Sequence, residues 1–187
     1  MSTRENLIES TRALLWERGY VGTSPKAIQE RAGAGQGSMY HHFSGKPALA
    51  LAAIQRTADQ MRERVEHALA GPGTAQEKIA AFLAQERDVL KGCPIGGLTQ
   101  DPDLMADPAL RAPVEDTLTW LRERLTALIT QAREHGQQTA VPDAATTAAV
   151  IVATMQGGYV LARAANSTAP FTQATDGLLA LLATQWR

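Results

Sequence analysis

Apolar residues recur at helical spacing along the whole chain, and no run of alternating apolar and polar residues is bounded by turn residues. The first apolar segment carries Leu7, Ile8, Leu14 and Leu15 on one face, and it ends at Gly19, a residue suited to the position after a helix. The pattern therefore predicts an all-α protein whose helices pack their apolar faces together.

Two short helices are predicted directly after Gly19. Ser24 can cap the first of them, Pro25 fits its first position, and Gly33 ends it after about two turns. The turn Gly33-Ala34-Gly35 then leads into a further helix, expected at residues 36–43. Two short helices joined by such a turn are typical of a helix-turn-helix.

Longer amphipathic segments follow. Pro47 opens a helix that runs to about Ala70, and Gly71-Pro72-Gly73 is the clearest boundary in the chain. Thr74-Ala75-Gln76-Glu77 is a capping box for a helix expected to reach Gly92. Further helices are predicted around residues 98–105, at 108–135 with Pro113 bending its start, at 144–165 capped by Asp143, and at 170–186. We therefore expect a helix-turn-helix domain at residues 1–46 and a larger helical domain at residues 47–187, with 47–70 as a connecting helix.

Composition narrows the functional classes only slightly. The 187 residues carry a formal net charge of −1, but residues 1–64 hold 9 Lys and Arg against 6 Asp and Glu, while the remainder is acidic. A mildly cationic N-terminal part can meet phosphates. The single cysteine, Cys93, excludes an intramolecular disulfide and fits a reducing cytoplasm. The absence of a signal-like start or of about 18 consecutive apolar residues predicts an unexported protein with no membrane partner.

The helix at residues 36–43 is the candidate for entering the major groove of double-stranded DNA. Met39 and Phe43 lie four residues apart and would pack on the preceding helices, which leaves the other side chains on the outer face. Gly37 would let the backbone approach a phosphate. Gln36 and Ser38 can contact base edges or phosphates, and Tyr40 and His41 mainly the backbone. The expected phosphate anchors around this helix are Thr23, Lys26 and Lys46.

The run ERGYVGTSPKAIQERAGAGQGSMYHHFSGKPALALAAI resembles the DNA-binding signature of TetR-family regulators, in residue types and in order. The resemblance implies that Thr23, Tyr40, His41 and Lys46 contact phosphates, and that Gln36 and Ser38 lie near bases. Three positions depart from the usual signature: Gly35 replaces a Ser or Thr cap, Ala34 a Val, and Pro47 an acidic residue.

Two later segments, KGCPIGGL and MQGGYVLARA, resemble the TetR subgroup that regulates multidrug-efflux and flavonoid-response genes. The resemblance implies a dimer in which the last two long helices, residues 143–165 and 171–186, form a four-helix interface. Gly157 and Gly158 weaken a lone helix by about 1 kcal/mol each, which suggests that another backbone or a ligand approaches them closely.

The remaining candidates have structural interpretations beside functional ones. If a ligand pocket exists, its first candidates are Cys93, Trp120, Met155 and Tyr159, although such residues more often serve packing. Asp101, Asp103 and Asp107 could suggest a cation site, but turn and cap roles fit their neighbouring prolines better. The four histidines are not spaced as metal ligands, so we expect no metal site and no cofactor.

The sequence thus predicts a cytoplasmic, homodimeric, sequence-specific DNA-binding regulator, a repressor released from operator DNA by a small-molecule effector. A helical enzyme or redox sensor that uses Cys93, and a helical adaptor that does not bind DNA, are the alternatives.

Overall fold

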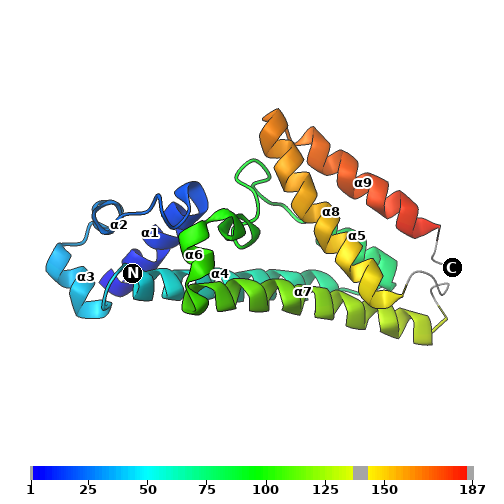
Figure 1. The fold of residues 1–187 in the computed structure, drawn as a ribbon. Coiled ribbons are helices and arrows are strands. Elements are labelled where there is room, and N and C mark those ends of the chain that lie inside the picture. Colours follow the sequence, from blue (N-terminus) through cyan, green and yellow to red (C-terminus); the bar gives the residue numbers. More distant parts are fainter. Residues whose placement is uncertain (1, 137–142, 185–187) are drawn as a thin grey trace. The chain divides into compact units, whose positions relative to one another are not determined.

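The computed structural model describes residues 2–136 and 143–184, and helices account for most of this part of the chain (Figure 1). No strand occurs among these residues, which confirms the expected all-α class. The helices are α1 (Thr3–Arg18), α2 (Pro25–Ala32), α3 (Gln36–His42), α4 (Lys46–Ala70), α5 (Ala75–Leu83), the 3-10 helix η1 (Gly96–Gln100), α6 (Pro102–Ala106), α7 (Pro108–Glu134), α8 (Ala144–Ala165) and α9 (Ala169–Ala183).

The described chain forms two compact units, each made of two segments. Unit 1 contains the residues up to Met61 together with Pro94–Thr117, and unit 2 contains Arg62–Cys93 together with the residues from Leu118 onward. The segment Pro94–Thr117, which the sequence interpretation assigns to the larger domain, therefore packs with the helix-turn-helix. The functional domain boundary at residue 46 stays a prediction.

Unit 1 has one apolar core beneath α1, α2 and α3. Its members are all buried: Leu7, Ile8, Leu14, Ile28, Met39, Phe43 and Leu49. Local signals set the ends of these helices as the sequence predicts. Ser24 accepts the N–H of Ala27 at the start of α2, and Gly33 ends α2 in the left-handed conformation at φ 61°. The turn that aims α3 is thus fixed by residues within it.

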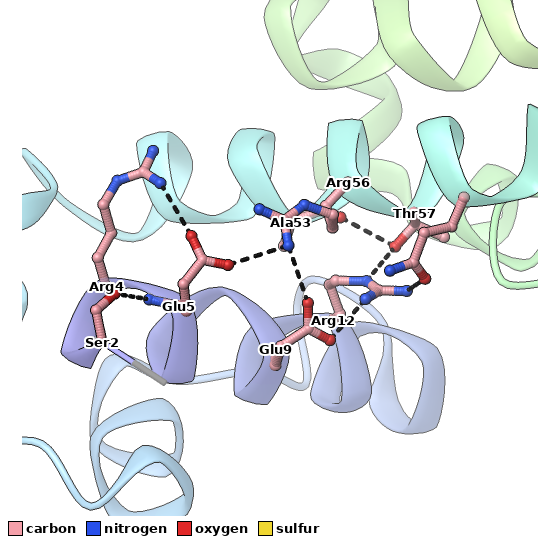
Figure 2. Close-up of polar contacts among 9 residues, drawn as sticks. Ser2, Arg4, Glu5, Glu9, Arg12, Ala53, Arg56 and Thr57 are labelled. Atoms are coloured by element: carbon pink, nitrogen blue, oxygen red, sulfur yellow. Dashed lines mark hydrogen bonds and ion pairs between the residues drawn. The ribbon is translucent and has the colours of Figure 1, made fainter. Parts of the chain in front are cut away.

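Polar contacts join α1 to the first half of α4, as Figure 2 shows. Arg12 donates to Glu9 at 2.6 Å and to the Thr57 hydroxyl at 3.1 Å. Arg56 donates to Glu5 at 3.0 Å and lies 3.5 Å from a Glu9 oxygen. These groups are partly exposed, so each pair adds little stability alone, but the network fixes how α1 lies along α4.

Asp101 ties Pro94–Thr117 to the loop between α1 and α2. One carboxylate oxygen accepts the N–H of Leu104 at 3.1 Å and so caps α6, as the sequence predicts. The other oxygen accepts the N–H of Val21 at 2.8 Å, a contact across 80 positions of sequence. Asp101 is only 8% exposed, and a buried carboxylate of this kind requires such donors. One side chain therefore fixes the loop and the start of α6 together.

In unit 2, α8 and α9 lie side by side (Figure 1). A Cβ atom added at Gly158 would lie 3.0 Å from a ring carbon of Phe171 and 3.5 Å from its Cα. The expected close approach of another backbone is thus confirmed at Gly158, where the neighbour is the start of α9. A Cβ atom added at Gly157 would meet no atom of another part of the described chain within 4 Å.

Several predicted helix bounds are wrong. The helix that begins at the Thr74 capping box is correctly placed, but it ends at Leu83 rather than at Gly92. A continuing helix would use the Phe82 carbonyl to accept the N–H of Glu86, whereas here the Arg87 guanidinium donates to that carbonyl at 2.5 Å. The segment expected around residues 98–105 is two short helices, η1 and α6, separated at Asp101.

Other bounds agree with the sequence interpretation. Asp143 caps α8 by accepting the N–H of Thr146, and α8 ends at Asn166 in the left-handed conformation. Pro113 lies inside α7, and the bend expected there stays a prediction. The expected helix end near Trp186 lies outside the described residues.

By length and composition, α8 is the one helix among the described residues that could cross a membrane. This is weak support for a membrane span, because core helices of soluble proteins meet the same criterion.

Candidate nucleic-acid interface

The short helix α3 is held by the buried side chain of Met39 and by that of Phe43, the residue directly after the helix. Met39 is fully buried and Phe43 nearly so, and the Gln29 side-chain amide donates to the Met39 sulfur at 3.4 Å. The N–H of Ala34 reaches back to the carbonyl of Gln29 at 3.0 Å and closes the turn that leads into α3. The predicted packing of Met39 and Phe43 is confirmed, and it fixes which face of α3 points outward.

The outward face of α3 carries polar and aromatic groups. Gln36, Gly37 and His41 are exposed, Tyr40 is 50% exposed, and Ser38 is half-buried. No side chain caps the start of α3, which agrees with the departure noted at Gly35. An added Cβ at Gly37 would meet no atom within 4 Å, so the fold does not require glycine there. The space beside it is open to another molecule.

Two of the three expected phosphate anchors lie at the surface of unit 1. Lys26 is 85% exposed and forms only a loose pair with Glu30, at 3.8 Å. The Lys46 ammonium lies over the Tyr20 ring, 4.0 Å from its centroid. Burial lowers the pKa of Lys46, and the charges of Asp101 and Asp103 act in the opposite direction. The contact with the Tyr20 ring therefore fixes the position of the Lys46 ammonium group.

Thr23 does not fit the expected contact with a phosphate. It is fully buried, and its hydroxyl donates to the carbonyl of Gly19 at 2.7 Å. Its side chain therefore closes the loop between α1 and α2, and in this geometry it does not reach the surface. A threonine that follows a helix-ending glycine can serve the loop itself, and the sequence gives no signal that separates this role from a surface contact.

The structure adds one cation that the sequence interpretation missed. The Arg4 guanidinium lies over the Phe43 ring, 5.4 Å from its centroid, and its side chain is half exposed. A positive charge therefore lies at the end of α3 although it comes from the start of α1. Arg4 and Phe43 are too far apart in sequence for spacing to indicate this contact.

Unit 2 brings together three of the four residues named as pocket candidates. Met155, Tyr159 and Cys93 are all buried, and the Arg87 guanidinium donates to the Met155 sulfur at 3.5 Å. Arg87 also acts electrostatically on both Tyr159 and Cys93. The fourth candidate, Trp120, is half-buried and lies instead beneath the Arg62 guanidinium, at 5.8 Å. The structure thus adds Arg87 to this group and leaves Trp120 apart.

Burial dominates the electrostatics of this group. It raises the pKa of Tyr159 to about 12, although the positive charge of Arg87 acts in the opposite direction. Burial likewise lowers the pKa of Arg87. The phenol is therefore neutral over the physiological range and can donate a hydrogen bond. The described residues contain no group of three His, Cys, Asp or Glu side chains that could hold a metal ion.

Comparison with known proteins places these features in one family. The family model described as "Bacterial regulatory proteins, tetR family" matches residues 7–53, and the "Tetracyclin repressor-like, C-terminal domain" model matches residues 75–178. The chain is 27% identical to the HTH-type transcriptional regulator LmrA of Bacillus subtilis, over 90% of each chain. It is 25% identical to the HTH-type transcriptional repressor NemR of Escherichia coli, over 97% of this chain and 94% of NemR.

Solved structures agree with these matches. The crystal structure of a TetR transcriptional regulator from Chloroflexus aurantiacus is 32% identical, with a TM-score of 0.87 over 99% of this chain and 96% of that one. The reduced form of Escherichia coli NemR, at 22% identity, shares the fold with a TM-score of 0.85 over 99% of this chain and 97% of that one. Two models that together span most of the chain and this similar structure, combined with an outward-facing α3, lead to one conclusion: the chain belongs to the TetR family of bacterial regulatory proteins, and it is a DNA-binding transcription regulator.

Proposed function

We propose that the protein is a homodimeric repressor that binds operator DNA through α3 and is released by a small-molecule effector. The observation that carries the proposal is the division of α3 into a buried face, at Met39, and an exposed polar face, with the buried Phe43 directly after the helix. A recognition helix needs this division, because one face must pack on the other helices of the DNA-binding domain while the opposite face enters the DNA groove. The name of the similar protein NemR, a transcriptional repressor, supports repression.

Residue roles follow from position and chemistry. Gln36 reads a base edge at the start of α3, whereas Tyr40 contacts the DNA backbone from its exposed position. Tyr40→Ala should therefore weaken binding to every sequence, and Gln36→Ala should alter the preference at one base position. Gln131→Ala, on the exposed side of α7, is the matched control and should leave both properties unchanged.

The test is binding to the DNA upstream of the protein's own gene, measured across salt concentrations. Binding through phosphates weakens steeply as salt rises because condensed counterions are released. Weak binding that is flat in salt would contradict the proposal and favour an adaptor without a DNA role. Unchanged binding by both α3 variants would show that α3 is not the helix in the groove.

The dimer interface in this proposal is the exposed apolar face of α8 and α9. Val160, Leu161 and Leu181 are 67%, 55% and 69% exposed, which is unusual for such side chains. Gly157 on α8 and Gly177 on α9 lie on the same faces as these residues, and an added Cβ at either would meet nothing within 4 Å. Glycines on an open apolar face let the helices of a second copy approach closely.

Leu161→Glu tests this interface. A carboxylate cannot be buried there without a partner, so we expect the protein to become monomeric in sedimentation or light-scattering measurements. Glu123→Gln, on the exposed side of α7, is the control and should remain dimeric. A Leu161→Glu protein that is still a dimer would place the interface elsewhere.

Release by an effector is a shift between populations. In a dimer, the two DNA-binding domains fit two half-sites of the operator that lie about one turn of DNA apart, or a multiple of it. An effector that favours a different spacing between these two domains lowers the affinity of the dimer for the operator. The effector must bind the released state more tightly, because equal affinity for both states shifts nothing. Since bacterial DNA lies in the cytoplasm, this function places the protein there.

An enzyme that uses Cys93 is the rival function. The similar proteins are transcription regulators, which favours regulation over catalysis. A reaction catalysed by the wild type and lost in Cys93→Ser would support the enzyme instead.

A further inference from the structure

Arg87 in unit 2 has unusual surroundings for a charged side chain. Its guanidinium carbon lies 5.6 Å from the centroid of the Phe82 ring and 5.7 Å from that of Phe171. Its nitrogens donate to the Phe82 carbonyl at 2.5 Å and to the Met155 sulfur at 3.5 Å, and more weakly to the Gln85 side-chain oxygen at 3.4 Å. The cation is therefore partly buried, and its neighbours are mainly aromatic rings and a thioether.

No carboxylate forms an ion pair with Arg87 in the part of the chain that the structure describes. The groups whose charges act on it are Tyr159, Cys93 and Arg64. None of these groups is a carboxylate, and Arg64 has the same sign of charge as Arg87. Arg87 is partly buried, and a guanidinium that loses part of its hydration gains more from a paired anion than from weak contacts with neutral groups. The Phe82 carbonyl is the one strong acceptor, and together with the weak contacts to Met155 and Gln85 it leaves at least two of the five N–H donors of Arg87 without an acceptor among the described residues.

A second hydrogen-bond donor without an acceptor lies on α8. The Gln156 side-chain nitrogen is buried and has no hydrogen-bond partner in the structure. Gln156 directly follows Met155, which Arg87 contacts. Gln156 also precedes Tyr159 by three positions, so the side chains of Gln156 and Tyr159 are neighbours on the surface of α8. Unmatched buried donors cost free energy until an acceptor arrives.

We propose that Arg87 is the anion-binding residue of the effector site, and that the effector is a monocarboxylate with an apolar body. The carboxylate takes the free guanidinium donors in the two-bond geometry that arginine favours, with Gln156 or the Tyr159 hydroxyl as a further donor. The apolar body packs against Phe171 and Met155, which already form the apolar surroundings of the cation. This inference rests on the proposed function, because it names the chemical class of the effector.

The test compares carboxylates with neutral amides of the same shape. Benzoate, cinnamate and decanoate are titrated against wild-type protein by calorimetry beside benzamide, cinnamamide and decanamide. At least one acid should bind more tightly than its amide and should weaken operator binding. In Arg87→Gln that acid should lose affinity by about 30-fold, the lower end of the range for removing one partner of a buried charge pair, because Arg87 is only partly buried; the affinity of the amide should change little.

Two further variants separate charge from folding. Arg87→Lys keeps the charge and should retain part of the preference for the acid, whereas Arg122→Gln removes an exposed arginine of α7 and should keep all of it. Circular dichroism and melting temperature establish that each variant is folded.

The proposal is overturned if no acid binds more tightly than its amide, or if the preference survives in folded Arg87→Gln. Both results leave the proposed function intact when the wild type still binds its operator without added ligand. A wild type that binds no operator DNA would instead remove the proposed function, and this inference with it.

Discussion

Replacing Asp101 by asparagine should destabilise unit 1 and loosen the loop between α1 and α2. The side chain is almost fully buried, and its two oxygens accept the N–H groups of Val21 at 2.8 Å and Leu104 at 3.1 Å. Asparagine keeps one accepting oxygen but presents an NH₂ group where the second stood. One backbone N–H would then face another donor instead of a carboxylate.

The size of the effect follows from this geometry. A hydrogen bond to a charged group contributes about 1.5–3 kcal/mol, and Asp101→Asn removes one such bond and leaves a buried donor unmatched. We therefore expect the free energy of unfolding to fall by about 1.5–3 kcal/mol. For a chain of this length that corresponds to a melting temperature lower by about 3–12 °C.

Differential scanning calorimetry and urea unfolding measure this loss, with Asp103→Asn as the matched control. Asp103 lies two positions later, is exposed and has no comparable buried contact, so the same change of charge should cost little there. Operator affinity should fall in Asp101→Asn as well, because Val21 belongs to the loop that leads into α2. Equal stability of the two variants would refute the assignment of Asp101 as the tie between these segments.

Three further predictions concern unit 2. In Gly158→Ala the new methyl group would press on Phe171 at 3.0 Å, which costs about 1–3 kcal/mol, while α8 gains about 1 kcal/mol from the loss of a glycine, so the net destabilisation in urea unfolding should be up to about 2 kcal/mol. Thr74→Ala removes the hydroxyl that accepts the N–H of Glu77, and it should cost about 1 kcal/mol in the same assay. Burial raises the pKa of Tyr159 from 10.0 to about 12, so its phenol ionises first in the unfolded chain. Wild-type stability should therefore fall between pH 10 and 12 more than that of Tyr159→Phe, as urea midpoints across that range would show.

Each of these predictions has a control and a contradicting outcome. Gly97→Ala adds a methyl group in open space and should be nearly neutral, so equal losses at positions 97 and 158 would refute the packing argument. Thr74→Ser keeps the capping hydroxyl, so its free energy of unfolding should stay close to that of the wild type. An equal loss of stability in Thr74→Ser and Thr74→Ala would refute the role of the hydroxyl. Parallel pH profiles for wild type and Tyr159→Phe would show that Tyr159 ionises alike in both states.

The sequence predicted best those features that a few adjacent residues decide. Ser24 with Pro25, the capping box at Thr74 and the cap at Asp143 each carry their own hydrogen-bonding partners within a turn of helix, so no other part of the chain is needed to place them. The division of α3 into buried and exposed faces follows in the same way at Met39, whereas Phe43, which is buried as predicted, lies just after α3 in extended backbone and so does not share a helical face with Met39.

The features that sequence reasoning missed depend on distant partners. The early end of α5 reflects a side chain five residues on, Arg87, whose position also involves Met155 and Phe171. The contact between Asp101 and Val21 spans 80 positions, and that between Arg4 and Phe43 joins two helices. The burial of the Thr23 hydroxyl was not foreseen, because a loop-closing hydroxyl and a phosphate-binding one look alike in sequence. Apolar periodicity contains no information about any of these pairings.

Because Pro94–Thr117 packs with the helix-turn-helix, the compact unit that contains the DNA-binding helices is not one contiguous stretch of sequence that can be excised from the chain. A chimaera grafted at residue 46 would separate the loop at Val21 from its native acceptor on Asp101. A hybrid that transplants both stretches together would keep that bond. A regulator of this kind that is engineered to bind a different operator should therefore receive both segments of unit 1 from the same parent protein.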